Sequence, residues 1–192
     1  MKAYFQNLWH SKPLQLIILL FIITRLTSVI FSKGFGMHDD HFCVIEPAQG
    51  WAENNNSRTI ANYDVDIPIN GLNLFYPGAH CYLFKAMEWF GIYNPDVKML
   101  IVRLLHALLS LIIVIGGYNI SLKIHTLKSA RLVGLLLTLY FFMPFLSVRT
   151  LVEFTCIPFL ILTYQYLDKA IDRKNLWFAL LAGIFLGISI NI

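Results

Sequence analysis

Charged residues are scarce in this 192-residue chain, at 14% of the sequence. A soluble domain usually carries about 25%. Hydrophobic residues make up 57%, which is more apolar surface than a soluble domain of this size can bury. This composition argues against a soluble enzyme, a disordered chain and a nucleic-acid-binding protein. It predicts an integral membrane protein.

Cysteines, charge runs and repeats are lacking as well. The three cysteines, Cys43, Cys81 and Cys156, are too few for a disulfide framework and match no zinc-finger spacing. The sequence contains no run of like charges, no low-complexity tract and no internal repeat. The fold is therefore predicted from the positions and lengths of the apolar segments.

Several segments are apolar over roughly the 20 residues that a membrane-spanning helix needs. They are Leu14–Phe31, Leu100–Leu122, Leu132–Val148, Leu151–Leu167 and Leu176–Ile192. The fourth contains Pro158, where we expect a kink. The first is followed by no small-residue cleavage site, so we interpret it as a span rather than a signal peptide. We predict an all-α integral membrane protein with about five transmembrane helices.

The distribution of charge predicts the orientation. The N-terminus and the short segments 123–131 and 168–175 are rich in Lys and Arg, whereas 33–99 is rich in Asp and Glu. Basic loops face the cytoplasm. We therefore expect a multi-pass protein with a cytoplasmic N-terminus, in a bacterial inner membrane or, in a eukaryote, the endoplasmic reticulum. Segment 33–99 then faces the periplasm or lumen.

We expect a single membrane domain over residues 1–192, with 33–99 as an external loop that holds the candidate active site. Spaced apolar residues at Asp40–Trp51 and Ala79–Trp89 predict short amphipathic helices on the membrane surface. Their apolar residues need burial, so we predict that the loop packs on the outer ends of the first two spans. Because the chain stops within an apolar run, we expect it to be the front part of a longer polytopic protein.

Four ionisable residues lie within or against the spans, all toward the predicted external side: Arg25, Arg103, Arg149 and Glu153. An arginine at a helix centre costs about 2.5–3.5 kcal/mol, so such residues usually face a cavity or a partner. The guanidinium group donates two parallel hydrogen bonds to a phosphate. We interpret these residues as the wall of a polar cavity for an anionic group. The alternative is snorkelling and structural pairing, for example of Arg149 with Glu153.

A polar motif follows the first span: His38, Asp39, Asp40 and His41. A carboxylate here can act as a general base on an attacking hydroxyl. Alternatively, the carboxylates can bind a divalent cation, Mg²⁺ or Mn²⁺, together with substrate phosphates. A third interpretation is zinc held by His38, His41 and His80. The fourth is a solvated polar turn without chemistry. The spacing alone leaves these alternatives open.

Residues 38–48 resemble the first-loop signature of the GT-C superfamily of glycosyltransferases. The closest pattern is H-P-D-E-H-F-Q-x-x-E-x-A, that of the lipid-linked mannosyltransferases of glycosyltransferase family 22. Asp39 and Asp40 fall on its two adjacent acids, and Glu46 falls on its later Glu. The positions that depart from the pattern are Met37, His38 and Cys43.

Further matches come in the family's order along the chain. Phe75–Gly78 resembles the Tyr-Pro stretch that closes the first loop, and Arg103–Ser110 resembles the start of the second helix. Ser147–Glu153 resembles the pattern S-R-T-x-x-N-x-x-E, although it lacks the Asn and its Glu comes earlier. A full member has more helices than this chain, in agreement with a front fragment. We expect the fragment alone to be inactive.

The resemblance implies a GT-C-like enzyme that transfers a sugar from a polyprenyl-phosphate donor, with inversion, to a glycan, lipid or protein acceptor at the periplasmic or lumenal face. Its partners would be these substrates and membrane lipids, with no nucleic acid. The reaction needs a base and a positive charge at the leaving phosphate. We assign the base to Asp39 or Asp40, and the leaving phosphate to Arg103 and Arg25. The remaining predicted substrate-binding residues are His38, His41, Glu46, Tyr76, His80, Arg149 and Glu153.

The competing class is a polytopic membrane protein that is not an enzyme. A transporter fragment is one form, but transporters place polar residues near the bilayer midplane and within repeated halves. A subunit that binds a lipid carrier is another form. A catalytically inactive front half would also bind the carrier without chemistry.

Overall fold

The computed structural model describes residues 9–34, 41–53 and 73–192. Its regular elements are helical. In chain order they are α2 (Pro13–Phe31), the π-helix η1 (His41–Ile45), α4 (Glu46–Ala52), α5 (Phe75–Trp89), α6 (Pro95–Ile124), α7 (Leu127–Leu139), α8 (Met143–Leu146), α9 (Val152–Arg173) and α10 (Leu176–Asn191). The prediction of an all-α protein is confirmed for the described part.

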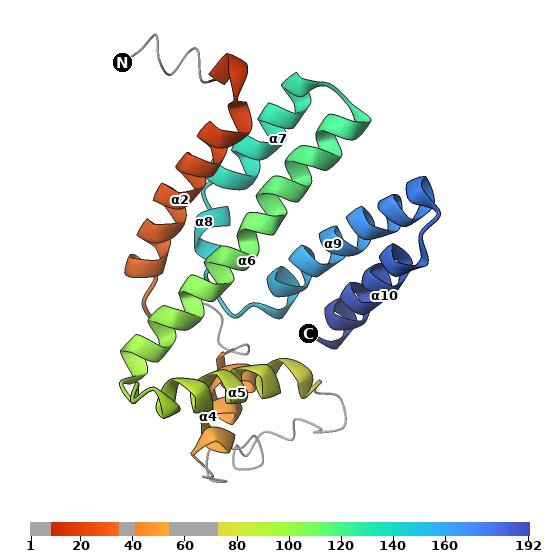
Figure 1. Cartoon of the computed structure of the whole chain (residues 1–192). Helices are drawn as coiled ribbons and strands as arrows, with labels where there is room; N and C mark the ends of the chain where they lie inside the picture. The colour runs from red at the N-terminus through yellow and green to blue at the C-terminus, as the bar shows by residue number, and fades with distance from the viewer. Residues whose placement is uncertain (1–8, 35–40, 54–72) are drawn as a thin grey trace.

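The long helix α6 organises the molecule (Figure 1). The Asn94 side chain caps its N-terminus by accepting hydrogen bonds from the backbone N–H groups of Asp96 and Val97. Pro95 stands in the first turn, where its missing N–H costs nothing. At 30 residues, α6 is about 45 Å long, which exceeds the roughly 30 Å of a bilayer's hydrocarbon core.

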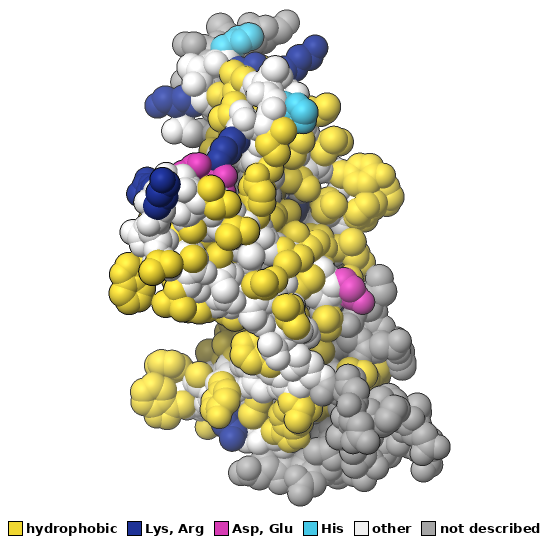
Figure 2. All heavy atoms as spheres, turned by 90° about the vertical axis from the view of Figure 1, so that its right-hand side faces the viewer, with side chains coloured by type: hydrophobic (Ala, Val, Ile, Leu, Met, Phe, Trp, Pro, Cys, Tyr) yellow, Lys and Arg dark blue, Asp and Glu magenta, His cyan; other side chains and the backbone are white. Residues whose placement is uncertain are grey.

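Two helices in the described part are long and apolar enough to cross a membrane, α2 and α6, while α10 is apolar but shorter. Large hydrophobic side chains remain exposed on these helices, including Ile23, Ile30, Leu180 and Ile190. Figure 2 shows hydrophobic side chains over much of one face of the molecule. An apolar exterior of this extent suits lipid rather than water. The first two predicted spans are confirmed as candidates, and the total of five is not.

The third predicted span, Leu132–Val148, is not one helix. Helix α7 ends at Leu139, Tyr140 is extended (φ −59°, ψ 126°), and α8 begins at Met143. Pro144 explains the break, because a proline in a continuing helix clashes with the carbonyl four residues before it, here that of Tyr140. The helix therefore ends before Tyr140, whose carbonyl would clash with Pro144 if the helix continued.

Glycines allow the helices to approach closely. A Cβ on Gly116 of α6 would lie 2.2 Å from Ile161 of α9, and one on Gly134 of α7 would lie 2.8 Å from Ile17 of α2. Helices in a membrane associate through such small residues. Helices α2, α6 and α7 pack together, and α9 and α10 form a hairpin whose α9 contacts α6.

The elements η1, α4 and α5, here named the cap unit, cover the N-terminal end of α6 (Figure 1). Val44, Ala48 and Phe84 of the cap unit share a core with Val102 of α6. The predicted packing of the loop onto the second span is thus confirmed. The predicted surface helices at Asp40–Trp51 and Ala79–Trp89 correspond to η1–α4 and to α5.

Candidate functional site

Two arginines meet at the chain segment that leaves α2. Arg103 of α6 donates from Nη1 to the carbonyl oxygen of Ser32 at 3.4 Å. Arg149, from the turn before α9, donates to the carbonyl oxygens of Lys33 (3.5 Å) and Gly34. Two guanidinium groups from distant parts of the sequence therefore hold the backbone that leads into the acidic motif.

The two positive charges influence each other. Burial lowers the pKa of Arg149 below its ordinary value, and the positive charge of Arg103 lowers it further. Arg103 is 9% exposed, and its contact with Ser32 uses one of the five N–H donors of a guanidinium group. In the part of the chain that the structure describes, Nε of each arginine is buried without a hydrogen-bond partner. A nearby pair of like charges with unused donors is suited to an anion.

Arg25 contacts the C-terminal end of α7. It is 3% exposed and donates to the carbonyl oxygens of Thr138 (3.0 Å) and Leu137 (2.9 Å). Its guanidinium carbon also lies 4.8 Å from the ring centre of Phe21. The last carbonyls of a helix lack hydrogen-bond donors within the helix. Arg25 supplies these donors at the C-terminal end of α7. Its assignment to the leaving phosphate therefore gains no support.

The predicted catalytic residues Asp39 and Asp40, with His38, lie outside the described residues. Gly34 and His41 are the described residues that flank segment 35–40: Gly34 accepts a hydrogen bond from Arg149, and His41 begins η1. The assignment of the base to Asp39 or Asp40 stays a prediction.

His41 and Glu46 line a cavity of about 290 Å³ in the cap unit, here named the cap cavity. His41 Nε2 lies 3.6 Å from Glu46 Oε1. The full lining is His41, Ile45, Glu46, Gln49, Glu53, Phe84, Tyr93, Pro95, Lys98 and Met99. The structure thus brings together two of the predicted substrate-binding residues and surrounds them with polar groups that the prediction did not include.

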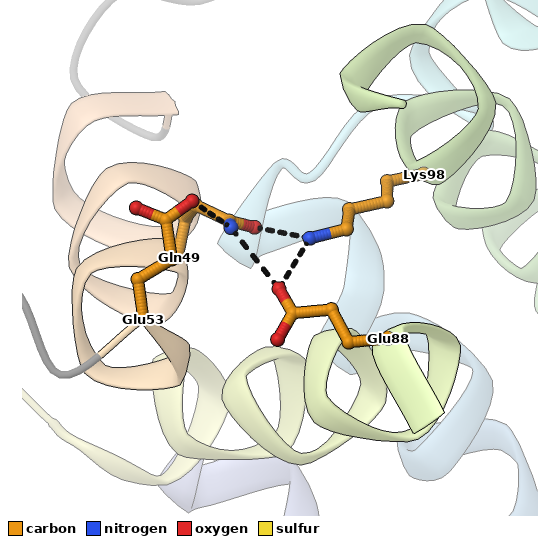
Figure 3. A network of polar contacts seen from close by, with 4 residues as sticks. All are labelled: Gln49, Glu53, Glu88 and Lys98. Carbon is orange, nitrogen blue, oxygen red and sulfur yellow. Dashed lines mark hydrogen bonds and ion pairs between the residues drawn. The ribbon is translucent and has the colours of Figure 1, made fainter. Parts of the chain in front are cut away.

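A polar network forms one wall of the cap cavity (Figure 3). Lys98 Nζ lies 2.6 Å from Glu88 Oε1 and donates to Gln49 Oε1 at 3.2 Å. Gln49 Nε2 in turn donates to Glu53 Oε1 at 2.7 Å. The network joins α4, α5 and α6. The sequence signal for it is Lys98 itself, since a cation near the start of a long apolar helix predicts a partner.

Tyr76 and His80 do not line the cap cavity. They line a second cavity of about 320 Å³, here named the helix cavity, together with Phe75, Ala79, Leu83, Leu105, His106, Leu109, Thr155, Phe159, Ile188 and Ile192. The Tyr76 hydroxyl lies 2.6 Å from His106 Nε2 and 3.1 Å from Thr155 Oγ1. The predicted role of Tyr76 and His80 in sugar binding gains no support from this position.

The zinc hypothesis required His38, His41 and His80 in one place. His41 lines the cap cavity and His80 lines the helix cavity. The residues that the structure describes contain no cluster of three or more His, Cys, Asp or Glu side chains that could hold a metal ion.

Glu153 and Arg149 do not form the ion pair that their spacing allowed. Within the described ranges, Arg149 bonds to backbone carbonyls and lies over the Phe145 ring at 4.6 Å. Glu153 stands exposed in the first turn of α9. Backbone oxygens therefore compete with the carboxylate for Arg149, which sequence spacing does not reveal.

The family is settled by comparison with known proteins. The model of the Alg9-like mannosyltransferase family matches residues 16–190, from α2 to α10. No curated protein and no solved structure matches the chain. The match covers nearly the whole sequence, including the arginine pair and the cap unit, and agrees with the resemblance seen in the sequence motifs. The chain belongs to the Alg9-like mannosyltransferase family.

Proposed function

We propose that this chain contributes the active site of a multi-pass membrane glycosyltransferase that uses a polyprenyl-phosphate sugar donor and inverts the anomeric carbon. The observation that carries the proposal is the convergence of Arg103 and Arg149 on the carbonyls of residues 32–34. That backbone leads within a few residues to Asp39 and Asp40. The two arginines contact a part of the chain only a few residues before the aspartates. The proposal therefore combines cations for the leaving phosphate with carboxylates for the base.

The chemistry follows from these groups. Asp39 or Asp40 takes the proton of the acceptor hydroxyl as its oxygen attacks the anomeric carbon. The bond from that carbon to the phosphate oxygen breaks, and the electron pair leaves with the polyprenyl phosphate. Arg103 and Arg149 stabilise the added negative charge through charge-assisted hydrogen bonds. In a metal-dependent form of this mechanism, the two aspartates would hold a Mg²⁺ or Mn²⁺ ion. Adding a chelator to the transfer assay distinguishes this form from the metal-free mechanism.

The cap cavity suits the acceptor rather than the donor. Carboxylates of Glu46 and Glu53 line it, and they accept hydrogen bonds from sugar hydroxyls but repel phosphate. Tyr93, which is 70% exposed, supplies an aromatic surface at the same cavity. Its volume, about 290 Å³, is at the lower end of the roughly 300–1,000 Å³ of ligand sites. We assign a glycan or glycolipid acceptor to it, on the periplasmic or lumenal face.

The test uses the full-length parent in vesicles with a polyprenyl-phosphate sugar. Asp39→Asn is expected to lower the transfer rate by about 10²–10⁴ while donor binding persists, because only a base is removed. Arg103→Ala and Arg149→Ala are expected to weaken donor binding as well. Arg131→Ala is the matched control, since Arg131 contacts His10 and Trp9 elsewhere in the molecule.

Two outcomes oppose the proposal. Wild-type transfer rates in Asp39→Asn, Asp40→Asn and the double variant would remove the carboxylates from the mechanism. Loss of donor binding in the arginine variants of a parent that transfers no sugar would instead identify a subunit that binds a lipid carrier without chemistry.

A further inference from the structure

The helix cavity has an unusual lining for a site beside a glycosyltransferase centre. Of the described residues that line it, none is Lys, Arg, Asp or Glu, and most are aliphatic or aromatic. The polar side chains that reach it are Tyr76, His80, His106 and Thr155. An apolar space with a few convergent polar groups is typical of a site for a small amphipathic ligand.

The protonation of His80 follows from its contacts. Its Nδ1 lies 3.0 Å from the backbone oxygen of Tyr76, and a carbonyl only accepts, so Nδ1 carries the proton. Burial lowers the pKa of His80 below its ordinary value, against a smaller opposing effect of that hydrogen bond. The ring is therefore neutral near pH 7, and its Nε2 is an acceptor.

The other polar groups of the cavity already bond to one another. His106 Nδ1 donates to the Val102 carbonyl at 2.8 Å, so the neutral ring accepts the Tyr76 hydroxyl at Nε2. The Thr155 hydroxyl lies 2.8 Å from the Leu151 carbonyl. No hydrogen bond to His80 Nε2 occurs within the described residues, although His80 is only 5% exposed. His80 lines the cavity, and an acceptor at an apolar site is stabilised when a donor reaches it.

We propose that the helix cavity binds the hydroxyl end of an uncharged membrane lipid, with His80 Nε2 as the acceptor of the lipid's O–H group. The lining accommodates the hydrocarbon chain. A phosphate or carboxylate would be desolvated without a cation, which is costly. The source of the ligand is the surrounding bilayer, since Phe75 and Leu105 of the lining are also exposed on the surface. This site is independent of the proposed sugar transfer.

The experiment compares three probes of one chain length: dodecanol, dodecyl methyl ether and dodecyl phosphate. They are titrated into the detergent-solubilised protein, and the ¹⁵N signals of the histidine rings are recorded. Dodecanol is expected to shift the His80 Nε2 signal and to bind about three- to tenfold more tightly than the ether, as one neutral hydrogen bond allows. Dodecyl phosphate is expected to leave the signal unchanged.

Variants locate the effect. His80→Phe keeps a ring and removes the acceptor, so dodecanol is expected to bind no better than the ether. His125→Phe, at the far end of α6, is the matched control and should retain the preference. Ala79 is exposed and lines the helix cavity, so Ala79→Leu places a larger side chain there. This variant is expected to weaken the binding of dodecanol and of dodecyl methyl ether to the same extent.

Equal binding of dodecanol and ether to the wild type would overturn the proposal and leave an apolar crevice without selectivity. A preference for dodecyl phosphate would overturn it in favour of a charged-lipid site. Persistence of the dodecanol preference in His80→Phe, with unchanged circular dichroism, would also overturn it. Sugar transfer is not part of any readout, so these outcomes leave the proposed function untouched.

Discussion

The cap cavity and the helix cavity are nearly equal in size, at about 290 and 320 Å³, yet opposite in polarity. Both use side chains of α5 and α6. The cap cavity is lined by His41, Glu46, Glu53 and Lys98, whereas no charged residue among those that the structure describes lines the helix cavity. Further lining residues come from η1 and α4 in the cap cavity and from α9 and α10 in the helix cavity, and they account for most of the difference in chemistry.

Position along α5 decides which cavity a side chain lines. Tyr76, His80 and Leu83 recur at intervals of three and four residues and line the helix cavity, as expected for one face of a helix. Phe84, one turn beyond His80 on the same side of α5, lines the cap cavity. The change from an apolar to a charged lining therefore follows the helix axis, as α5 passes from the neighbourhood of α9 to that of α4.

The largest effect is expected from truncating Phe84, which lines the cap cavity. Phe84 is 1% exposed, lies 5.5 Å below the Lys98 amine and contacts the His80 ring at 6.3 Å between centroids. Phe84→Ala is expected to lower the free energy of unfolding by about 3–5 kcal/mol, measured by denaturant titration in detergent. Phe90→Ala is the control, because Phe90 is 73% exposed. A similar loss in both variants would contradict the assignment of Phe84 to the core that joins the cap unit to α6.

Breaking the charge network affects the cap cavity alone. Lys98 is 4% exposed, so Lys98→Met leaves the Glu88 carboxylate near an apolar side chain. We expect the free energy of unfolding to fall by about 2–3 kcal/mol. This is below the range for a fully buried pair, because Glu88 is partly exposed. The double variant Lys98→Met/Glu88→Leu should recover most of this loss. If the double variant is no more stable than the single one, the pair is not the unit that holds α5 to α6.

A smaller effect is expected in the helix cavity. Tyr76→Phe removes the hydroxyl that His106 and Thr155 contact and leaves His106 Nε2 without that donor. We expect a loss of about 1–3 kcal/mol in the free energy of unfolding. Tyr140→Phe, at the partly exposed break after α7, should change stability little. Equal stability of both variants would mean that water replaces the Tyr76 hydroxyl.

The smallest effect is a pH dependence specific to the helix cavity. The pKa of His80 is lower in the folded protein than its ordinary value, so the unfolded chain binds the proton more readily. The contribution of His80 to stability is therefore complete above about pH 6.5 and declines as the pH falls below it, toward the lowered pKa. The melting temperature of wild type should fall more than that of His80→Phe between pH 7.5 and pH 5.5 (about one unit either side of the ordinary value). His125→Phe should follow the wild type.

Local features of the sequence predicted part of this architecture. The apolar runs located α2 and α6, and spaced apolar residues located the helices of the cap unit, because hydropathy and helical periodicity act over neighbouring residues. The prediction of one helix over Leu132–Val148 was wrong, because Pro144 is incompatible with a helical hydrogen bond to the carbonyl of Tyr140, four residues earlier. His41 and Glu46 were predicted to bind substrate, and the structure brings both to one cavity. Gln49 was missed because its partner, Lys98, is 49 residues away. Glu88 is ten residues from Lys98, but the two lie on different helices, so their pairing depends on how α5 packs against α6.

Motifs were sufficient to predict the family, which the family model confirms, and hydropathy located two candidate membrane spans, since both depend on residues close together in the sequence. They could not separate Arg25 from Arg103, because each is an arginine in an apolar helix. Only the packed structure distinguishes them: Nη1 and Nη2 of Arg25 donate to carbonyls at the end of α7, whereas Arg103 meets a second cation, Arg149, at the end of α2. Which carbonyls a buried cation meets depends on where other helices end, and that is set by tertiary packing rather than by the sequence around the cation.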